Sequence, residues 1–402
     1  MSRELVLLAI SMATWGVGEG MFIFFQPLYL QKLGASPVEI GAILGGVGVS
    51  MALAHIPAGL LADRIGRKQV LISGWLIGLL SAWIMALAPS LLIFTIGLLT
   101  FSTTIFILAP LYSYVTAARG KLSIGRSITL ISASFNTGAI IGPVIGGLVG
   151  DQIGLRQVYV IAGCIFIVST LMVFFIRPQA IEVRSKDRAL NALHLDTRYI
   201  IYLCVVFFAV LAMFLPQSLS SNFLQNERGL SLGQIGQLGT ISYLGVVVLN
   251  LILGQGDARV GFLLGQAAVG FFALFLWIGT GFPWFMIGYF FLGGNRTSRS
   301  LASAQTRDFV HQSNMGLAFG ITETVSSAAI ILAGPLSGYL YSLNPIWMYP
   351  TSLVLVIISL ICGTVFFPFR FPKTGSQDFT QTRAVPEEQV LAEVNPSTLK
   401  GE

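Results

Sequence analysis

Long apolar stretches alternate with short polar connections along most of the chain. A helix of about 20 apolar residues spans a hydrocarbon core about 30 Å thick, and stretches of that length recur as far as residue 368. There are twelve, at 5–30, 38–58, 69–88, 91–116, 127–149, 157–176, 199–223, 233–253, 262–281, 284–305, 316–341 and 347–368. The pattern predicts an all-α membrane protein with twelve transmembrane helices in two six-helix bundles.

The two halves share landmarks in the same order. Three anchors repeat at an offset of 195 residues: Gly59 and Gly254, Arg64 and Arg259, Gly66 and Gly261. Three more repeat at an offset of 192: Gly142 and Gly334, Pro143 and Pro335, Gly146 and Gly338. The acids match less well, because Asp257 lies one position before the counterpart of Asp63. The repeat predicts two pseudo-symmetric bundles.

Polar segments set the expected boundaries. We expect an N-terminal bundle over 1–176, a cytoplasmic linker over 177–198, a C-terminal bundle over 199–368 and a disordered cytoplasmic tail over 369–402. The first apolar stretch continues past Glu19 without a small-residue cleavage site, and the repeat requires it. We therefore interpret it as a helix rather than a signal peptide.

Composition and charge place the chain in a membrane. Charged residues are 10% of the chain and apolar residues 54%, against roughly 25% charged in soluble domains. With the N-terminus in the cytoplasm, only Lys32, Arg156 and Arg228 of the 23 Lys and Arg fall outside. This positive-inside bias predicts a multi-pass protein of a bacterial-type cytoplasmic membrane with both termini inside. The same bias explains the net charge of +6, so we expect a lipid bilayer and no nucleic acid as partner.

Residues that could carry catalysis are sparse. Cys164, Cys204 and Cys362 fall inside predicted helices, and the three histidines are dispersed, which argues against a metal site. The chain has no P-loop, nucleophile or catalytic carboxylate pair that we recognise. The sequence predicts no enzyme and no cofactor, so energy for any transport must come from a gradient or a partner.

Two motifs resemble those of a known family. The stretch containing Gly59, Asp63, Arg64, Gly66 and Arg67 is similar to the signature loop between helices 2 and 3 of the major facilitator superfamily. The run Gly138, Gly142, Pro143 and Gly146 resembles the helix 5 motif common among its proton-coupled exporters. The resemblance covers residues 5–368. It implies helices 1, 4, 7 and 10 around a central cavity and alternating access about it.

Both motifs have a physical rationale. The loop glycines permit a sharp turn, and the resemblance implies that Asp63, with Arg64 and Arg67, holds the inward side shut. We expect a gating loop here and in its copy at Gly254, Asp257, Arg259 and Gly261; solvated charges that only set topology are the alternative.

The helix 5 glycines form a packing groove and Pro143 permits a bend, so this motif and its copy at Gly334, Pro335 and Gly338 serve packing or a hinge.

Four charged residues fall inside predicted helices. Such a charge costs about 2.5–3.5 kcal/mol at the bilayer centre, so it needs a partner or water. Arg299 and Glu323 are at similar depth in adjacent helices and are expected to form a structural ion pair. Glu19 and Arg296, near mid-depth, are expected to face each other. We predict a proton and substrate cavity formed by Glu19, Arg296, Trp15, Phe22, Gln26, Gln217 and Asn295, with ordinary helix packing as the alternative for each uncharged member.

The charge balance of this cavity predicts a function. Two acids and two arginines are neutral together, and a proton on Glu19 leaves one net positive charge. We expect a secondary active transporter of a small organic solute, proton-coupled and working as a monomer. The helix 5 motif favours export, the preferred direction, whereas the two arginines favour proton-linked import of an anionic metabolite. A uniporter would use the same cavity without protons, and a non-transporting membrane sensor would keep the fold without needing these charges.

Overall fold

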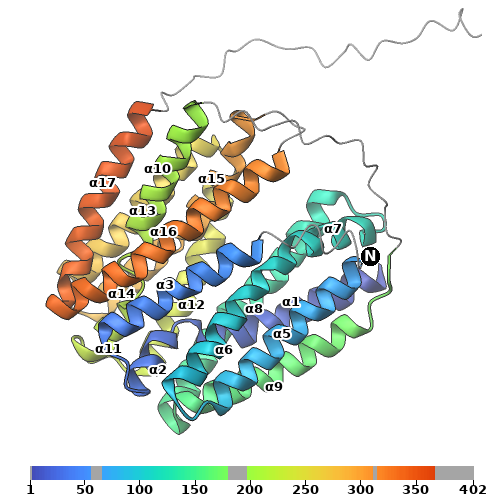
Figure 1. The fold of residues 1–402 in the computed structure, drawn as a ribbon, viewed down its shortest axis with the longest axis horizontal. Coiled ribbons are helices and arrows are strands. Elements are labelled where there is room, and N and C mark those ends of the chain that lie inside the picture. Colours follow the sequence, from blue (N-terminus) through green and yellow to red (C-terminus); the bar gives the residue numbers. More distant parts are fainter. Residues whose placement is uncertain (1, 56–65, 180–196, 311–314, 367–402) are drawn as a thin grey trace, which may run out of the picture. The chain divides into compact units, whose positions relative to one another are not determined.

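The computed structural model describes residues 2–55, 66–179, 197–310 and 315–366 (Figure 1). In the first half the elements are α1 (Arg3–Ile23), α2 (Gln26–Lys32), α3 (Pro37–His55), α5 (Arg67–Leu87), α6 (Leu91–Thr103), η1 (Thr104–Ile107), α7 (Leu108–Ala118), α8 (Ile124–Ile153) and α9 (Leu155–Phe174). In the second half they are α10 (Thr197–Phe214), α11 (Ser220–Asn226), α12 (Leu232–Leu253), α13 (Ala258–Ile278), α14 (Phe282–Leu292), α15 (Gly294–Gln305), η2 (Thr306–Asp308), α16 (Met315–Leu343), η4 (Pro345–Trp347) and α17 (Met348–Phe366). No strand occurs in these ranges.

Helix lengths match the predicted membrane fold. Within the described ranges, eleven helical segments are long and apolar enough to cross a membrane. The predicted stretch 284–305 is not among them, because a break at Gly293 divides it into α14 and the polar α15. Together α14 and α15 make the twelfth crossing. The expected division into bundles at 1–176 and 199–368 stays a prediction.

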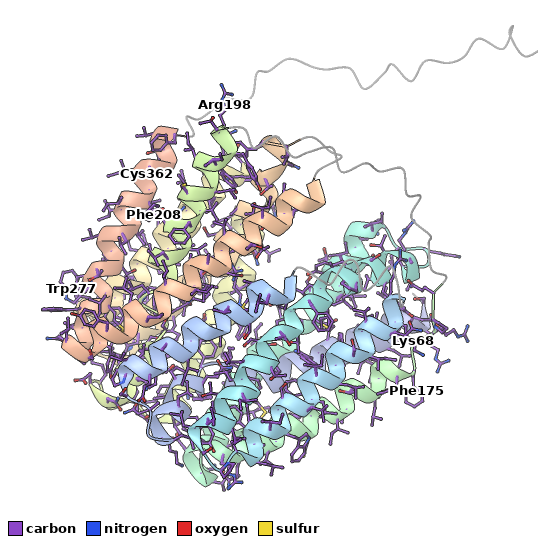
Figure 2. The ribbon with its side chains drawn as sticks, viewed as in Figure 1. Lys68, Phe175, Arg198, Phe208, Trp277 and Cys362 are labelled. Carbon is purple, nitrogen blue, oxygen red and sulfur yellow. The ribbon has the colours of Figure 1, made fainter. Side chains whose placement is uncertain are left out.

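Large apolar side chains cover the outside of the helices. Phe175, Phe208 and Trp277 are 60%, 54% and 38% exposed, and Figure 2 shows Phe175 and Trp277 at opposite edges of the molecule. Exposed apolar surface on this scale indicates a membrane environment rather than water. The exterior therefore agrees with the composition of the chain.

Four crossings are interrupted, helices 4 and 10 near their middle and helices 1 and 7 nearer the end that follows the break. Helix 1 breaks at Phe24 and Phe25, helix 4 at η1, helix 7 over 215–219 and helix 10 at Gly293. The eight other crossings are continuous over their described lengths. Interrupted helices free backbone groups and loosen the local geometry, which suits them to line a site rather than a lipid-facing wall. They are the four helices that the resemblance assigns to the central cavity.

The helix 5 glycines pack α8 against α1 within the first half. A Cβ added at Gly138 would lie 2.7 Å from the Val17 nitrogen, and one at Gly142 would lie 2.8 Å from the Met21 nitrogen. A Cβ at Gly146 would lie 2.8 Å from the Met21 Cα. The two backbones therefore touch directly, as a row of small residues permits.

Both motif helices also make contacts between the halves, α8 beside its glycine row and α16 through the motif glycines themselves. A Cβ at Gly239 of α12 would lie 2.9 Å from the Pro143 Cβ of α8. In the second copy, a Cβ at Gly334 of α16 would lie 3.1 Å from the Gly45 Cα of α3. The repeated glycine and proline positions thus join α8 to α12 and α16 to α3.

These contacts lie toward one end of the helices. We call it the predicted outer face; it carries the connections at 33–36, 88–90, 227–231 and 279–281. Here Asp151 of the first half accepts hydrogen bonds from the backbone nitrogens of Leu232 (2.9 Å) and Gly233 (2.7 Å). Asn222 Nδ2 donates to Gln31 Oε1 at 2.5 Å. The halves are therefore held together at the predicted outer face.

Candidate functional site

Glu19 lies in α1 one turn before the break in helix 1. Its Oε2 accepts a hydrogen bond from Trp15 Nε1 at 3.1 Å, across one helical turn. Trp15 is buried in the first half, with its ring 5.3 Å from that of Trp75 and 4.6 Å from that of Phe166. The indole thus anchors Glu19 to the core of the first half, while the Glu19 side chain itself is half-buried.

Arg296 lies in α15, in the first turn after the break in helix 10. Its Nη2 donates to the Tyr243 hydroxyl at 3.2 Å, and its Cζ lies 4.9 Å from the centre of the Tyr243 ring. Tyr243 is buried in α12, whereas Arg296 is exposed although it lies midway along its crossing. The phenol supplies both a cation–π surface and a hydrogen-bond acceptor.

Close packing at the break places Tyr243 beside Arg296. A Cβ added at Gly293 would lie 3.0 Å from the Gly245 Cα of α12. Only two glycines allow the helices to approach this far, so α12 touches helix 10 at its break. Tyr243, two residues before Gly245, and Arg296, three residues after Gly293, then meet.

Charges from both halves meet in the interior. Glu19 and Arg296 interact electrostatically, although they do not form a direct ion pair. The Phe24 ring of the first half meets the Tyr243 ring edge-on, with the centres 5.9 Å apart. Arg296 contacts Tyr243, and Tyr243 meets Phe24 of the first half, so the guanidinium lies near the junction of the two halves.

The other predicted cavity residues are distributed unevenly. Gln217 lies half-buried in the break of helix 7, and Asn295 is buried with its Oδ1 lacking a hydrogen-bond partner among the described residues. Gln26 is buried at the first position of α2. Phe22 is fully buried, with its ring 5.2 Å from that of Phe101 and 5.3 Å from that of Tyr159. Phe22 is therefore packed in the core of the first half.

Tyr243 and Phe24 were missed by the sequence reasoning. The helical spacing that selected Trp15, Glu19, Phe22 and Gln26 assumes an unbroken helix, but helix 1 turns at Phe24. Tyr243 lies among other polar residues of its helix, such as Thr240 and Ser242, so the sequence pattern alone did not single it out.

Arg299 and Glu323 are directly paired. Arg299 Nη2 lies 3.0 Å from Glu323 Oε2, and Ser303 Oγ donates to the other carboxylate oxygen at 2.7 Å. Their side chains are 22% and 31% exposed. This pair compensates its own charge, so Glu19 and Arg296 carry the charge chemistry of the site.

The predicted gating loop is described only in part. Gly59, Asp63 and Arg64 lie outside the described residues. Gly66 has φ 94°, a backbone conformation that favours glycine, and it directly precedes α5. Arg67 Nη1 donates to Gln179 Oε1 at 3.3 Å, which ties the start of α5 to the chain that follows α9.

The second copy of the loop is described throughout. Gly254 ends α12, and Asp257 caps α13 by accepting from the nitrogens of Arg259 (2.8 Å) and Val260 (3.3 Å). Arg259 Nη2 lies 3.9 Å from Asp308 Oδ2. Gly261 lies close to Leu253 and Leu301. These contacts stay within the second half, and the gating role of both copies stays a prediction.

Comparisons with known proteins agree with this fold. The family model described as Major Facilitator Superfamily matches residues 8–255 and 201–397. Multidrug resistance protein 2 of Bacillus subtilis (strain 168) is 24% identical over 59% of this chain and 62% of its own. Multidrug resistance protein MdtG of Rahnella sp. (strain Y9602) is 30% identical over 46% of each chain. The chain thus spans about half of the length of such relatives.

A solved structure extends the likeness to nearly the whole chain. A crystal structure of a mutant of the nucleoside transporter NupG matches with a TM-score of 0.79 and 14% identity, covering 91% of this chain and 100% of that one. At this identity the likeness concerns the fold. The family model, by contrast, covers both halves of the sequence. The chain therefore belongs to the major facilitator superfamily, and its described helices are long and apolar enough for a multi-pass membrane protein.

Proposed function

We propose that the protein is a proton-coupled secondary transporter of a small organic solute that works by alternating access. Glu19 carries the proton, and Arg296 is the charge that faces it from the other half. The supporting observation is the exposed guanidinium of Arg296, which interacts with Glu19 without pairing with it directly. A charge at this depth is tolerated when it borders water, a partner or a solute.

The few groups around Glu19 support the proposed proton coupling. Arg296, Tyr243 and Trp15 interact with Glu19, and Arg296 is the charged one. A proton on Glu19 leaves the charge of Arg296 uncompensated, whereas Glu323 continues to neutralise Arg299. Proton binding therefore changes the electrostatic field that a solute meets, and the solute changes proton affinity by the same factor.

Alternating access is supported by where the halves touch. The backbone contacts of α3 with α16 and of α8 with α12 close the predicted outer face. Separation there, with closure at the opposite end, would present Glu19 and Arg296 to the other side. We keep the predicted setting: a functional monomer in the cytoplasmic membrane with both termini inside.

Two directions of transport have separate support. The glycine row of α8 and the multidrug resistance proteins among the relatives support export. The exposed Arg296 supports the alternative, proton-linked import of an anion. A solute that competes with the proton at Glu19 moves against the proton. A solute that binds alongside the proton moves with it, so the sign of proton movement separates the two.

Reconstituted vesicles test the proposal. Purified protein in proteoliposomes with trapped pyranine is given small organic acids, amines and neutral amides, and the internal pH is recorded together with solute flux. We expect one class to move protons, and Glu19→Gln to abolish that movement while solute exchange continues without a gradient. Glu227→Gln, an exposed acid at the predicted outer face, is the control. Gradient-driven accumulation by Glu19→Gln would contradict the role of Glu19.

A further inference from the structure

The guanidinium of Arg296 is only partly used by the protein. It has five N–H donors in a planar fork. In the described structure one hydrogen bond leaves it, from Nη2 to the Tyr243 hydroxyl, and the Tyr243 ring lies beside the guanidinium carbon. The side chain is nevertheless exposed. Donors on the exposed side are therefore available to a molecule between the halves.

Charge accounting makes Arg296 the cation that can receive an anion. Arg299 is paired directly with Glu323, whose other carboxylate oxygen accepts a hydrogen bond from Ser303. Glu19 is near enough to Arg296 to interact electrostatically but remains bonded to Trp15 instead. An incoming anion thus meets an exposed cation without having to displace a bound carboxylate.

We propose that this site takes a small organic monoanion, with a carboxylate on the open edge of Arg296 and a flat apolar body beside Phe24. This inference rests on the proposed function and names its substrate class. A carboxylate matches the planar fork of arginine and can be held by two parallel hydrogen bonds.

Aromatic side chains at the site fit the apolar body of such a solute. Phe24 is half-buried, and its ring centre lies 5.9 Å from that of Tyr243 and 6.3 Å from that of Tyr289. Phe24 therefore places an aromatic ring next to Tyr243, the residue that contacts Arg296. Aromatic rings prefer offset or edge-on neighbours at such separations, which suits a flat solute.

An organic cation is less well served by the same site. Its natural partner is Glu19, but this carboxylate is half-buried, already accepts a hydrogen bond from Trp15 and lies within the field of Arg296. A cation at Glu19 would approach Arg296 as a like charge, which is unfavourable in a medium of low dielectric constant. Arg296 is thus more accessible than Glu19, so the more accessible charge of the site is positive.

The proton and the anion should assist each other. Neutral Glu19 leaves Arg296 uncompensated, so the anion binds more tightly when Glu19 is protonated. Glu19→Gln imitates the protonated carboxyl group. It should keep anion binding, and that binding should lose its dependence on pH.

Matched solutes test the class of the substrate. We would use three acids with their neutral amides and corresponding amines (acetate, phenylacetate and indole-3-acetate) and measure binding to the purified full chain by calorimetry. We expect at least one acid to bind about tenfold or more tighter than its amide, and the aromatic acids to exceed acetate. Arg296→Gln should abolish the preference for the acid, and Arg296→Lys should retain part of it. Arg126→Gln, an exposed arginine at the start of α8, should leave the preference intact.

The outcomes separate this inference from the proposed function. Equal binding of acids and amides, a preference for amines, or an acid preference that survives Arg296→Gln would overturn the anion site. Amines that drive proton movement through Glu19 would uphold the proton-coupled transporter and reject the anion. Acids that bind through Arg296 but move no protons would uphold the anion site and reject the coupling. Folding of each variant is checked by its melting temperature.

Discussion

Asp151 and Gly233 are joined across the two halves, since Asp151 Oδ2 accepts the backbone N–H of Gly233 at 2.7 Å. The same carboxylate accepts the N–H of Leu232 through its other oxygen. The first N–H groups of a helix have no partner within the helix, and a negative charge there is favourable. A carboxylate at the end of one half thus caps the first turn of a helix in the other.

Removal of this cap should favour opening of the predicted outer face. Hydrogen bonds to a charged group contribute about 1.5–3 kcal/mol, so Asp151→Ala should shift the equilibrium between open and closed forms by about tenfold or more. A cysteine placed at Ser218 in a chain without its native cysteines would report this through faster reaction with an impermeant maleimide added from outside. Asp257→Ala removes a cap of the same kind within the second half and should not speed the reaction. An unchanged rate in Asp151→Ala would contradict the closing role of the cap.

Two glycines of α16 should respond oppositely to the same substitution. A Cβ at Gly334 would lie 2.6 Å from the Gly45 nitrogen, whereas a Cβ at Gly320 would meet nothing within 4 Å. Gly334→Ala should therefore cost about 1–3 kcal/mol of contact between the halves and slow transport. Gly320→Ala should be neutral or stabilising by about 0.5–1 kcal/mol, because alanine restricts the unfolded chain. Melting temperatures and initial transport rates of the pair check this, and equal effects would count against the α3–α16 contact.

The Tyr243 hydroxyl should matter for how Arg296 binds its anion. Tyr243→Phe keeps the ring beside the guanidinium but removes the acceptor of the Nη2 hydrogen bond. A net loss of about 1 kcal/mol predicts roughly fivefold weaker binding of the best acid. Tyr289→Phe removes a hydroxyl that contacts Ser220 instead and is the matched control. Calorimetric titration of both variants would show whether the effect is specific to Tyr243.

The Arg299–Glu323 pair should contribute to stability rather than to solute binding. Glu323→Gln leaves Arg299 without a counter-charge and should lower the free energy of unfolding by roughly 1–3 kcal/mol. The double change Arg299→Gln with Glu323→Gln should recover part of that loss, because no uncompensated charge remains. Thermal melting of the single and double variants measures the coupling. Loss of acid binding at unchanged stability would place the pair in the solute site instead.

Regular periodicity explains how much of the fold could be predicted. Apolar stretches of membrane-spanning length and the repeated Gly142-Pro143 and Gly334-Pro335 positions needed no tertiary information. The Gly293-Gly294 pair suggested a break in helix 10. The separate polar helix α15 that follows the break depends on how closely α12 packs at Gly245. The break at Phe24 and Phe25 lies just before Pro27, which cannot donate a hydrogen bond to the carbonyl of Ile23, so the sequence carried a signal for it that was not used.

The candidate site was predicted only where charge was the signal. An ionisable residue in a membrane helix is costly, so Glu19, Arg296, Arg299 and Glu323 stand out in any single sequence. Whether an uncharged residue lines the cavity depends on the direction in which its helix turns. For this reason Phe22 was expected at the cavity but is packed in the core. Tyr243 joins the site because α12 contacts helix 10, and the sequence pattern of one helix does not reveal such a contact.

The glycine contacts of α3 with α16 and of α8 with α12 have a consequence for repeated use. Surfaces made mainly of main-chain atoms have few side-chain rotamers to immobilise when they meet, and they release little conformational entropy when they part. The two arrangements of the molecule can then remain nearly equal in free energy. A small difference in binding free energy, such as that from one proton or one bound solute, is then enough to shift the equilibrium toward either arrangement.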